Sequence, residues 1–381
     1  MSDIAIVGVG LFPFGRHEGV TGLEMGARAV RAALADAGVS WSDIQFAYGG
    51  SFRSGAADAL VSHLGLTGVQ FINVHNGCAT ATSALVAACD AIGQGRHDLG
   101  VVVGFDKHPR GAFDFDPAFL GLGDWYGRLG LMQTPQFFAM RCTRYMHDHG
   151  ISREVLAKVA AKNRENGARN PNAWRRTALS EEEILGSRML NHPFTQYMFC
   201  SPDEGGAALV LCRADLARRY TDHPVYVRGV AVRTRKFGSF NVFSPSLPAE
   251  RAESPTEAAA RDCYEMAGIE PGDVDIAQLQ DSEPGSEIIA MAETGLCADG
   301  AQEAMIRAGE TRIGGRLPVN TDGGLIANGE PIGASGLRQI HELVLQLRGT
   351  AGDRQVPGTP RVGLAQVYGI PGTSGCTLLS S

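Results

Sequence analysis

Two patterns of hydrophobic and polar positions run along the chain: short apolar runs bounded by glycine, and longer stretches with helical spacing. In the first quarter of the chain they predict a strand, a helix, a strand, a helix and a strand, over residues 4–10, 21–40, 69–74, 79–95 and 99–105. The first helix should end near Gly38, because glycine readily adopts the left-handed conformation that closes a helix. Strand, helix and strand at this spacing indicate a parallel crossover unit with both sheet faces covered.

The middle of the chain, residues 107–195, differs in character. Aromatic and charged clusters replace the regular patterns, which favours a helical, loop-rich segment that covers a site. A buried strand resumes over residues 203–213. The second half then repeats the first in outline, as strands, a helix–turn–strand unit and a glycine-rich loop that leads into a helix, over residues 225–234, 254–282, 323–349, 361–369 and 375–381. Two halves of similar pattern predict a duplicated fold.

Composition narrows the class of protein. The 381 residues are 44% hydrophobic and 20% charged, which is typical of a folded globular chain of two domains or of one large α/β unit with an insertion. A net charge of −7 without a basic run argues against nucleic acid as a partner. No apolar stretch is long enough to span a membrane, and the start around Asp3 lacks a basic signal region, so we expect a cytoplasmic protein.

Eight scattered cysteines form no C-x-x-C pair, which argues against a zinc site and a disulfide scaffold. Cys78 stands apart, because "NVHNGCATATSAL" places it after a predicted strand and at the start of a helix of small residues. Free backbone N–H groups at a helix start favour a thiolate and can hold an oxyanion. A buried structural cysteine is an equally good interpretation of this stretch alone.

A second stretch, "PVNTDGGLIANGEPIGASGLRQ" over residues 318–339, combines repeated glycines with ordered polar residues. Together the two stretches resemble the thiolase superfamily, in particular the sterol-carrier-type (lipid-transfer) thiolases. That family pairs a loop containing C-A-[ST] with a later N-x-x-G-G-x-x-x-x-G-H-P-x-G-A-[ST]-G-x-R. The matching residues are Cys78, Ala79 and Thr80, then Asn320, Gly323, Gly324, Gly329, Pro331, Gly333, Ala334, Ser335, Gly336 and Arg338.

The resemblance covers essentially the whole chain and implies a thiolase-like, five-layered αβαβα fold of two related halves with an inserted loop domain. The N-terminal half would comprise residues 1–106 and 196–222, the loop domain 107–195, and the C-terminal half 223–381. It also implies a homodimer, with a tetramer left open. The substrate would be a coenzyme A thioester, with no bound cofactor or metal.

For the site, the resemblance implies a nucleophile at Cys78 and an oxyanion hole made by the backbone N–H groups of Cys78 and Gly372. The candidates for substrate binding lie in or beside the two motifs: His75, Asn320, Gly329 and Ser335. The aromatic residues of the middle segment either line an apolar channel or cap the core; they are Phe113, Phe115, Phe119, Trp125 and Tyr126.

Three departures from the family pattern put the usual chemistry in doubt. Glu330 stands where the family has its histidine, and Ser282 stands where H-D-C-F has a cysteine that is often assigned the α-proton transfer. In the last glycine-rich turn, Tyr368 lies near the place of a further catalytic cysteine. A carboxylate close to Cys78 raises the thiol pKa and repels a developing oxyanion, whereas a protonated Glu330 can donate a proton.

Three functions therefore stay open. The first is an acyl-CoA enzyme of lipid or steroid side-chain metabolism that makes or breaks a carbon–carbon bond, with Cys78 as nucleophile and Glu330 as altered acid/base. The second is a retro-aldol lyase on a β-hydroxyacyl-CoA that works with an OB-fold partner, with Tyr368, Glu330, Asp281 and Ser282 as acid/base candidates. The third is a silent acyl-CoA or lipid binder. Only the first requires Cys78.

Overall fold

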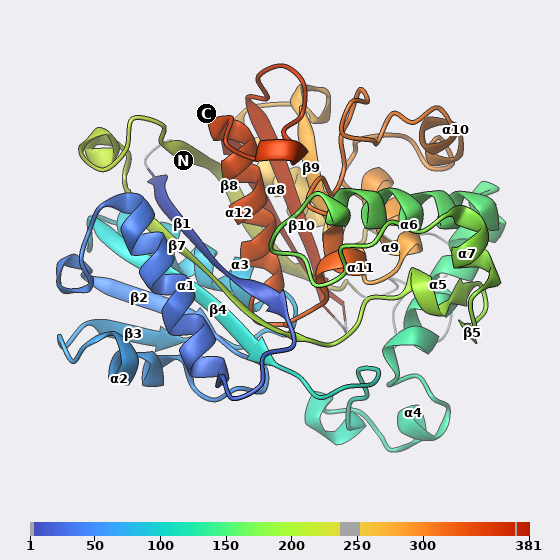
Figure 1. Ribbon diagram of the computed structural model, residues 1–381, viewed down its shortest axis with the longest axis horizontal. Helices are drawn as coiled ribbons and strands as arrows, with labels where there is room; N and C mark the ends of the chain where they lie inside the picture. The colour runs from blue at the N-terminus through green and yellow to red at the C-terminus, as the bar shows by residue number, and fades with distance from the viewer. Residues whose placement is uncertain (1–3, 237–251, 370–371) are drawn as a thin grey trace.

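A computed structural model describes residues 4–236, 252–369 and 372–381. The main sheet of these residues has nine strands in the order β3-β2-β4-β7-β1-β8-β11-β10-β9 (Figure 1). Its strands are β1 Ile4–Gly15, β2 Phe46–Gly50, β3 Gln70–Asn73, β4 Leu99–Lys107, β7 Glu204–Arg213, β8 Val225–Thr234, β9 Ile276–Leu279, β10 Val362–Gly369 and β11 Thr373–Ser380. The hairpin of β5 Met189–Asn191 and β6 Phe194–Thr195 stands apart from it.

Helices cover the sheet and build the middle segment. Their bounds are α1 Gly22–Ala37, α2 Val61–Leu64, α3 Thr80–Gly93, α4 Trp125–Arg128, α5 Thr134–His149, α6 Arg153–Ala168, α7 Glu181–Gly186, α8 Pro255–Ala267, α9 Pro284–Glu293, α10 Gln302–Arg307, α11 Gly324–Asn328 and α12 Ser335–Arg348. The predicted helix end at Gly38 is confirmed, since Gly38 has φ 66° and closes α1. Strand β2 and the short helix α11 were not predicted; both are only five residues long.

The sheet consists of two halves that meet where β1 pairs with β8 through Ala5 with Tyr226 and Ile6 with Val225. Within the N-terminal half, β2 runs parallel to β3 and β4, as a crossover through α3 requires. The other pairs of that half, β4 with β7 and β7 with β1, are antiparallel, so the sheet is mixed rather than purely parallel.

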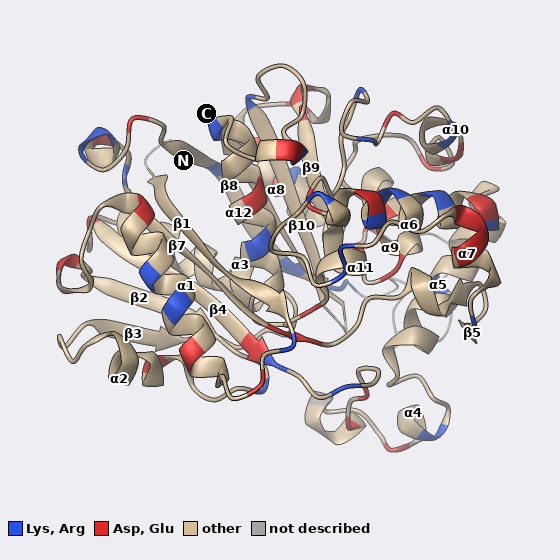
Figure 2. Ribbon diagram, viewed as in Figure 1, with Lys and Arg blue, Asp and Glu red and all other residues tan. Residues whose placement is uncertain are grey.

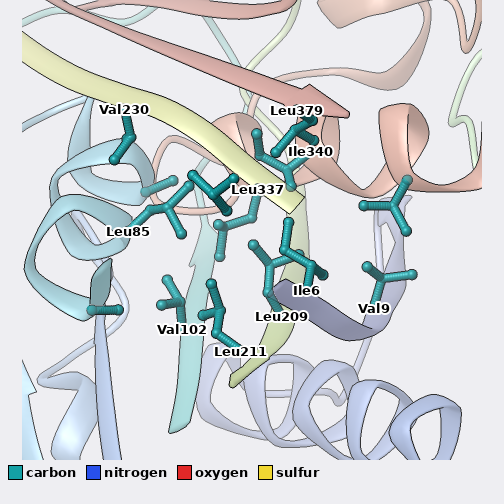
Figure 3. Close-up of a cluster of buried hydrophobic side chains, with 14 of the residues drawn as sticks. Ile6, Val9, Leu85, Val102, Leu209, Leu211, Val230, Leu337, Ile340 and Leu379 are labelled. Atoms are coloured by element: carbon teal, nitrogen blue, oxygen red, sulfur yellow. The ribbon is translucent and has the colours of Figure 1, made fainter. Parts of the chain in front are cut away.

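Five layers follow from which side chains share a core. Ala5 and Val7 of β1 pack with α1 on the outer face of the N-terminal half, whereas Ile4 and Ile6 of the same strand point to the inner face. There α3 and α12 lie between the two halves, and α8 covers the outer face of the C-terminal half. Leu85 of α3 and Leu337 of α12 meet in this inner core (Figure 3). Burying each such leucine contributes about 2 kcal/mol. The αβαβα fold is therefore confirmed.

The middle segment packs its own hydrophobic core, from α5 and α6 to β6, against α9 and α11 of the C-terminal half. In Figure 1 the helices α5, α6 and α7 lie beside the C-terminal half, and α4 projects from the body. Lys, Arg, Asp and Glu gather mainly on helices and loops, and most of the strand surface is free of charge (Figure 2). Within the described residues, no helix combines the length and the apolar character that a membrane crossing needs.

Candidate active site

Helix α3 begins at Thr80, two residues after Cys78 and one residue after the predicted start. A turn with Gly77 at φ 54° leads into the helix, and the Thr80 hydroxyl fixes that turn. It accepts a hydrogen bond from the Asn76 N–H at 2.8 Å and donates one to the Gly77 carbonyl oxygen at 2.7 Å. The small residues of α3 permit close packing, because a Cβ on Gly336 of α12 would lie 2.9 Å from the Ala81 Cβ.

Glu330 lies on the connection between α11 and α12, with its carboxylate buried. Its backbone N–H donates to the Ser201 carbonyl oxygen at 3.0 Å, which joins this connection to the segment before β7. The Gln280 amide donates to Oε1 at 2.9 Å, and the Cys200 thiol donates to Oε2 at 3.4 Å. Cys78 lies close enough to this carboxylate for the two groups to shift each other's pKa. The structure thus brings the two principal predicted site residues together.

Both residues line one small, mostly apolar cavity. Its lining residues are Phe52, Gly77, Cys78, Phe113, Phe115, Thr134, Phe138, Ser282, Glu330, Ile332 and Tyr368. A second, more open pocket shares Phe52, Phe113 and Phe115 with it and adds Phe119, Arg53 and His108. Phe113 and Phe115 of the middle segment thus line both the cavity and the second pocket, and Phe119 lines the second pocket only.

Electrostatics at the cavity favour protonated groups. Burial, the nearby Glu330 and the more distant Asp106 raise the pKa of the Cys78 thiol well above its usual range. Burial also raises the pKa of Glu330, while hydrogen bonds from Cys78 and Cys200 act in the opposite direction. At neutral pH the Cys78 thiol therefore keeps its proton. The expectation that the start of α3 would favour a thiolate is wrong in this state, because burial and two carboxylates outweigh the helix N-terminus.

The other acid/base candidates are placed differently. Ser282 lines the cavity and so does Tyr368, whose ring lies 4.6 Å from the guanidinium carbon of Arg141. Burial raises the pKa of Tyr368, although Arg141 and Arg235 act against this. Asp281 is not among the lining residues. Its carboxylate accepts the backbone N–H groups of Leu325 at 2.6 Å and Ile326 at 3.2 Å, at the start of α11.

The expected oxyanion hole has a particular geometry. The N–H of Gly372 donates to the Gly369 carbonyl oxygen at 2.8 Å, within a turn. Gly369 is the glycine that approaches the nucleophile loop, since a Cβ placed there would lie 3.3 Å from the Cys78 nitrogen. A role for Gly372 stays a prediction, and absence of a side chain at Gly369 keeps the space before the Cys78 N–H open.

None of the four predicted substrate-binding residues lines the cavity. His75 is exposed and stacks on Phe52 with ring centroids 5.2 Å apart. Asn320 is buried and accepts the Leu279 N–H at 2.9 Å, and Ser335 donates to the Ile332 carbonyl oxygen at 3.3 Å. Gly329 has φ 91° and no room for a Cβ, which would lie 2.1 Å from Asp203 Oδ2. Their part in substrate binding stays a prediction.

Sequence reasoning missed several groups that shape the site. Asp106, at the end of β4, accepts N–H groups from Phe52 at 2.8 Å and Gly333 at 2.7 Å. Burial alone would raise its pKa, but hydrogen bonds, first from His108, lower it. Cys200 and Gln280 hold Glu330 and were not predicted either. A carboxylate directly after a buried strand was the available signal for Asp106; Cys200 gave none, because it meets Glu330 only in space.

The chain is similar to proteins of one family over nearly its full length. Residues 4–177 match the family model "Thiolase, N-terminal domain" and residues 248–381 match "Thiolase C-terminal domain-like". The chain is 34% identical to an acetyl-CoA acetyltransferase of Methanothermobacter thermautotrophicus, over 98% of both chains. It is 31% identical to sterol carrier protein 2 of Oryctolagus cuniculus, over 98% of this chain and 71% of that one.

Among solved structures, the chain resembles one described as the Ltp2-ChsH2(DUF35) aldolase. The TM-score is 0.88 and the sequence identity 27%, over 100% of this chain and 98% of that one. The first sequence relative is named for acyl transfer, the second for carrying sterols, and the solved structure is named as an aldolase.

Proposed function

Because this chain belongs to the thiolase family, we propose that it acts on a coenzyme A thioester and cleaves the bond between the α- and β-carbons of a β-hydroxyacyl-CoA by a retro-aldol reaction. The observation that carries the proposal is the Glu330 carboxylate. It lines the cavity, it is buried, and it accepts hydrogen bonds from the Gln280 amide and the Cys200 thiol, at the position where the family resemblance leads us to expect a histidine. The resemblance to a solved aldolase supports it.

The reaction needs one base and one oxyanion site. Glu330 takes the proton of the β-hydroxyl group, the carbon–oxygen bond becomes a carbonyl, and the electrons of the broken carbon–carbon bond move into the thioester as an enolate. The enolate oxygen accepts a hydrogen bond from the backbone N–H of Cys78 at the start of α3. Tyr368, which keeps its proton, protonates the α-carbon and recovers that proton from Glu330. The products are a shorter acyl-CoA and an aldehyde or ketone.

Thiolytic acyl transfer is the second candidate, and the contact between Cys78 and Glu330 favours it. In that reaction Glu330 takes the thiol proton and the Cys78 sulfur attacks the 3-keto carbon of a 3-ketoacyl-CoA. The bond between the α- and β-carbons breaks, the α-carbon takes a proton and leaves in the shorter acyl-CoA, and free coenzyme A then removes the remaining acyl group from the sulfur. The raised pKa of Cys78 weighs against it, because the carboxylate that must accept the proton also repels the thiolate. For either reaction, the aromatic cavity suits an apolar acyl group from lipid or steroid side-chain metabolism.

The test is to incubate the protein with panels of β-hydroxyacyl-CoA and of 3-ketoacyl-CoA plus free coenzyme A. Mass spectrometry then measures the released carbonyl compound, the acyl-CoA products and any acyl adduct on the intact protein. We expect carbonyl release from β-hydroxyacyl-CoA, no adduct, and retained turnover in Cys78→Ala.

A mass increase that Cys78→Ala abolishes, together with thiolysis of the ketoacyl substrates, would overturn the lyase proposal in favour of acyl transfer. If the protein binds acyl-CoA but catalyses neither reaction, even with the partner protein added, the third function, a silent acyl-CoA binder, is the one that remains. Cys297→Ala is the matched control, because Cys297 is also half-buried but does not line the cavity.

Assembly is part of the proposal. Strand β3 forms an edge of the main sheet of the described residues, and Ile72 on it is 44% exposed. An open edge with an exposed apolar side chain invites pairing with a second copy, which supports the expected homodimer. A DUF35-type partner is proposed from the solved aldolase. Light scattering after size-exclusion chromatography tests the dimer, and full lyase turnover by the isolated protein would contradict the need for a partner.

A further inference from the structure

Cys200 touches the proposed base from outside the cavity. It lies in the segment between β6 and β7, its side chain is buried, and it is not among the lining residues of the cavity. Its backbone N–H donates to the Ser282 carbonyl oxygen at 2.9 Å, and its thiol donates to Glu330 Oε2 at 3.4 Å. One residue thereby joins two residues of the cavity wall, Ser282 through its backbone and Glu330 through its sulfur.

The surroundings make this thiol a donor. Burial, Glu330 and Asp281 raise the pKa of Cys200 well above its usual range, so the sulfur keeps its hydrogen at neutral pH. The Gln280 amide occupies the other carboxylate oxygen, Oε1, at 2.9 Å. Each oxygen of Glu330 therefore has a donor on the protein side, and these donors fix the rotation of the carboxylate.

The backbone around this contact is also fixed. Glu330 donates its N–H to the Ser201 carbonyl oxygen at 3.0 Å, and Arg175 donates to the Ser201 hydroxyl at 2.6 Å. The two ends of the thiol–carboxylate contact are thus held together by neighbouring hydrogen bonds. A contact anchored on both sides keeps its geometry when substrate enters, whereas the Cys78 contact lies in the cavity itself.

We propose that Cys200 is a positioning residue for the reaction, whose S–H, together with the Gln280 amide, holds the Glu330 carboxylate charged and turned toward the substrate. The inference rests on the proposed function of Glu330. Hydrogen bonds to the charged form of a carboxylate favour that form, and burial opposes it, so the donors decide whether a base is present at neutral pH. Cys78 cannot fill this role alone, because substrate displaces water and side chains in the cavity.

The test compares Cys200→Ala, which removes the donor, with Cys200→Ser, which keeps one. The pH dependence of kcat/KM on the best β-hydroxyacyl-CoA is measured for each. We expect the acid limb of Cys200→Ala to move to higher pH by about one unit, which is about tenfold lower kcat/KM below the limb. Cys200→Ser should restore most of the wild-type profile, because its hydroxyl donates in place of the thiol. Cys212→Ala is the control: it also removes a buried thiol, from β7, and should leave the limb in place.

A readout that needs no turnover separates this inference from the proposed function. The infrared band of the protonated Glu330 carboxyl, assigned by its loss in Glu330→Gln, is titrated in the full-length protein with pH. A higher midpoint in Cys200→Ala with recovery in Cys200→Ser supports the role of Cys200 even if no lyase activity is found. An unchanged midpoint in a folded Cys200→Ala, or a Cys200→Ser that behaves like Cys200→Ala, would overturn it.

Discussion

Two buried carboxylates, Asp281 and Glu330, belong to the same set of sequence candidates and do different work in the structure. The Asp281 side chain accepts two backbone N–H groups of α11 and the Asn163 amide, and it fills the space beside Gly324, where a Cβ would lie 2.1 Å from Oδ2. Glu330 accepts hydrogen bonds from two side chains, the Cys200 thiol and the Gln280 amide, and lines the cavity.

The difference shows how a carboxylate that stabilises the fold is placed, compared with the carboxylate that we propose takes part in the reaction. Burial raises the pKa of both groups, so a shifted pKa alone does not distinguish them. The Asp281 carboxylate accepts the backbone N–H groups at the start of α11, and its removal leaves these N–H groups without acceptors. Glu330 has its partners on the protein side and open space on the other, which is the arrangement that a proton-transfer group needs.

Glu330→Gln should show the largest effect on this comparison. The amide keeps the shape of the side chain but cannot accept the β-hydroxyl proton, so kcat/KM for retro-aldol cleavage should fall by about 10² to 10⁴. The melting temperature should stay near that of the wild type. A variant with wild-type turnover would remove Glu330 from the mechanism.

Asp281→Ala should lower the stability of the fold more than its activity, which is the opposite of the effect expected for Glu330→Gln. Two backbone N–H groups at the start of α11 lose their acceptor, and each costs about 1–3 kcal/mol of unfolding free energy. Denaturant unfolding measures the loss, and kcat per folded molecule should change much less than in Glu330→Gln. Loss of kcat without loss of stability would place Asp281 in the chemistry after all.

Glu283, two residues after Asp281, is a third buried carboxyl group, and its raised pKa affects the stability of the fold. Burial raises the pKa of this carboxyl from 4.5 to about 7 in the folded protein. The folded state therefore holds a proton that unfolding releases, and the resulting stability is full below pH 4.5 and lost as the pH rises through about 7. Glu283→Gln should remove a change of up to about 3 kcal/mol across this range, measured by denaturant unfolding at several pH values. A pH profile that matches the wild type would be the contrary result.

The reactivity of the Cys78 thiol depends directly on the charge of Glu330. Of the changes predicted here, the change in this reactivity should be the smallest. Replacing the carboxylate in Glu330→Gln or Glu330→His should lower the thiol pKa and raise its alkylation rate by iodoacetamide, about tenfold for each pKa unit. Peptide mapping measures the rate at Cys78, with Cys297 as internal reference. Glu330→His should also gain thiolysis; equal alkylation rates in all three proteins would separate Cys78 from Glu330.

Much of the fold could be predicted because its signals are local. The strand at residues 4–10, the helix that ends at Gly38 and the glycine-rich lead into α12 each carry their own pattern, and all three are found. Strand β2 was not predicted, because its five residues are all buried and include two glycines. They therefore show neither the alternation of apolar and polar residues nor the β-branched side chains that indicate a strand. Of the site, Cys78 and Glu330 could be named from their motifs, since motif spacing fixes the local backbone.

Hydrophobic periodicity, which acts over short distances along the chain, predicted the order of strands and helices from the sequence by itself. The resemblance of two motifs to a known family then implied the thiolase-like fold and pointed to Glu330 as a departure from the family pattern. The tertiary structure decided the rest. It turned Asp281 toward a helix start and Glu330 toward the cavity, and it brought Cys200, 130 residues away in sequence, to the same carboxylate. Protonation followed from that placement, because burial and neighbouring charges depend on which groups meet in space.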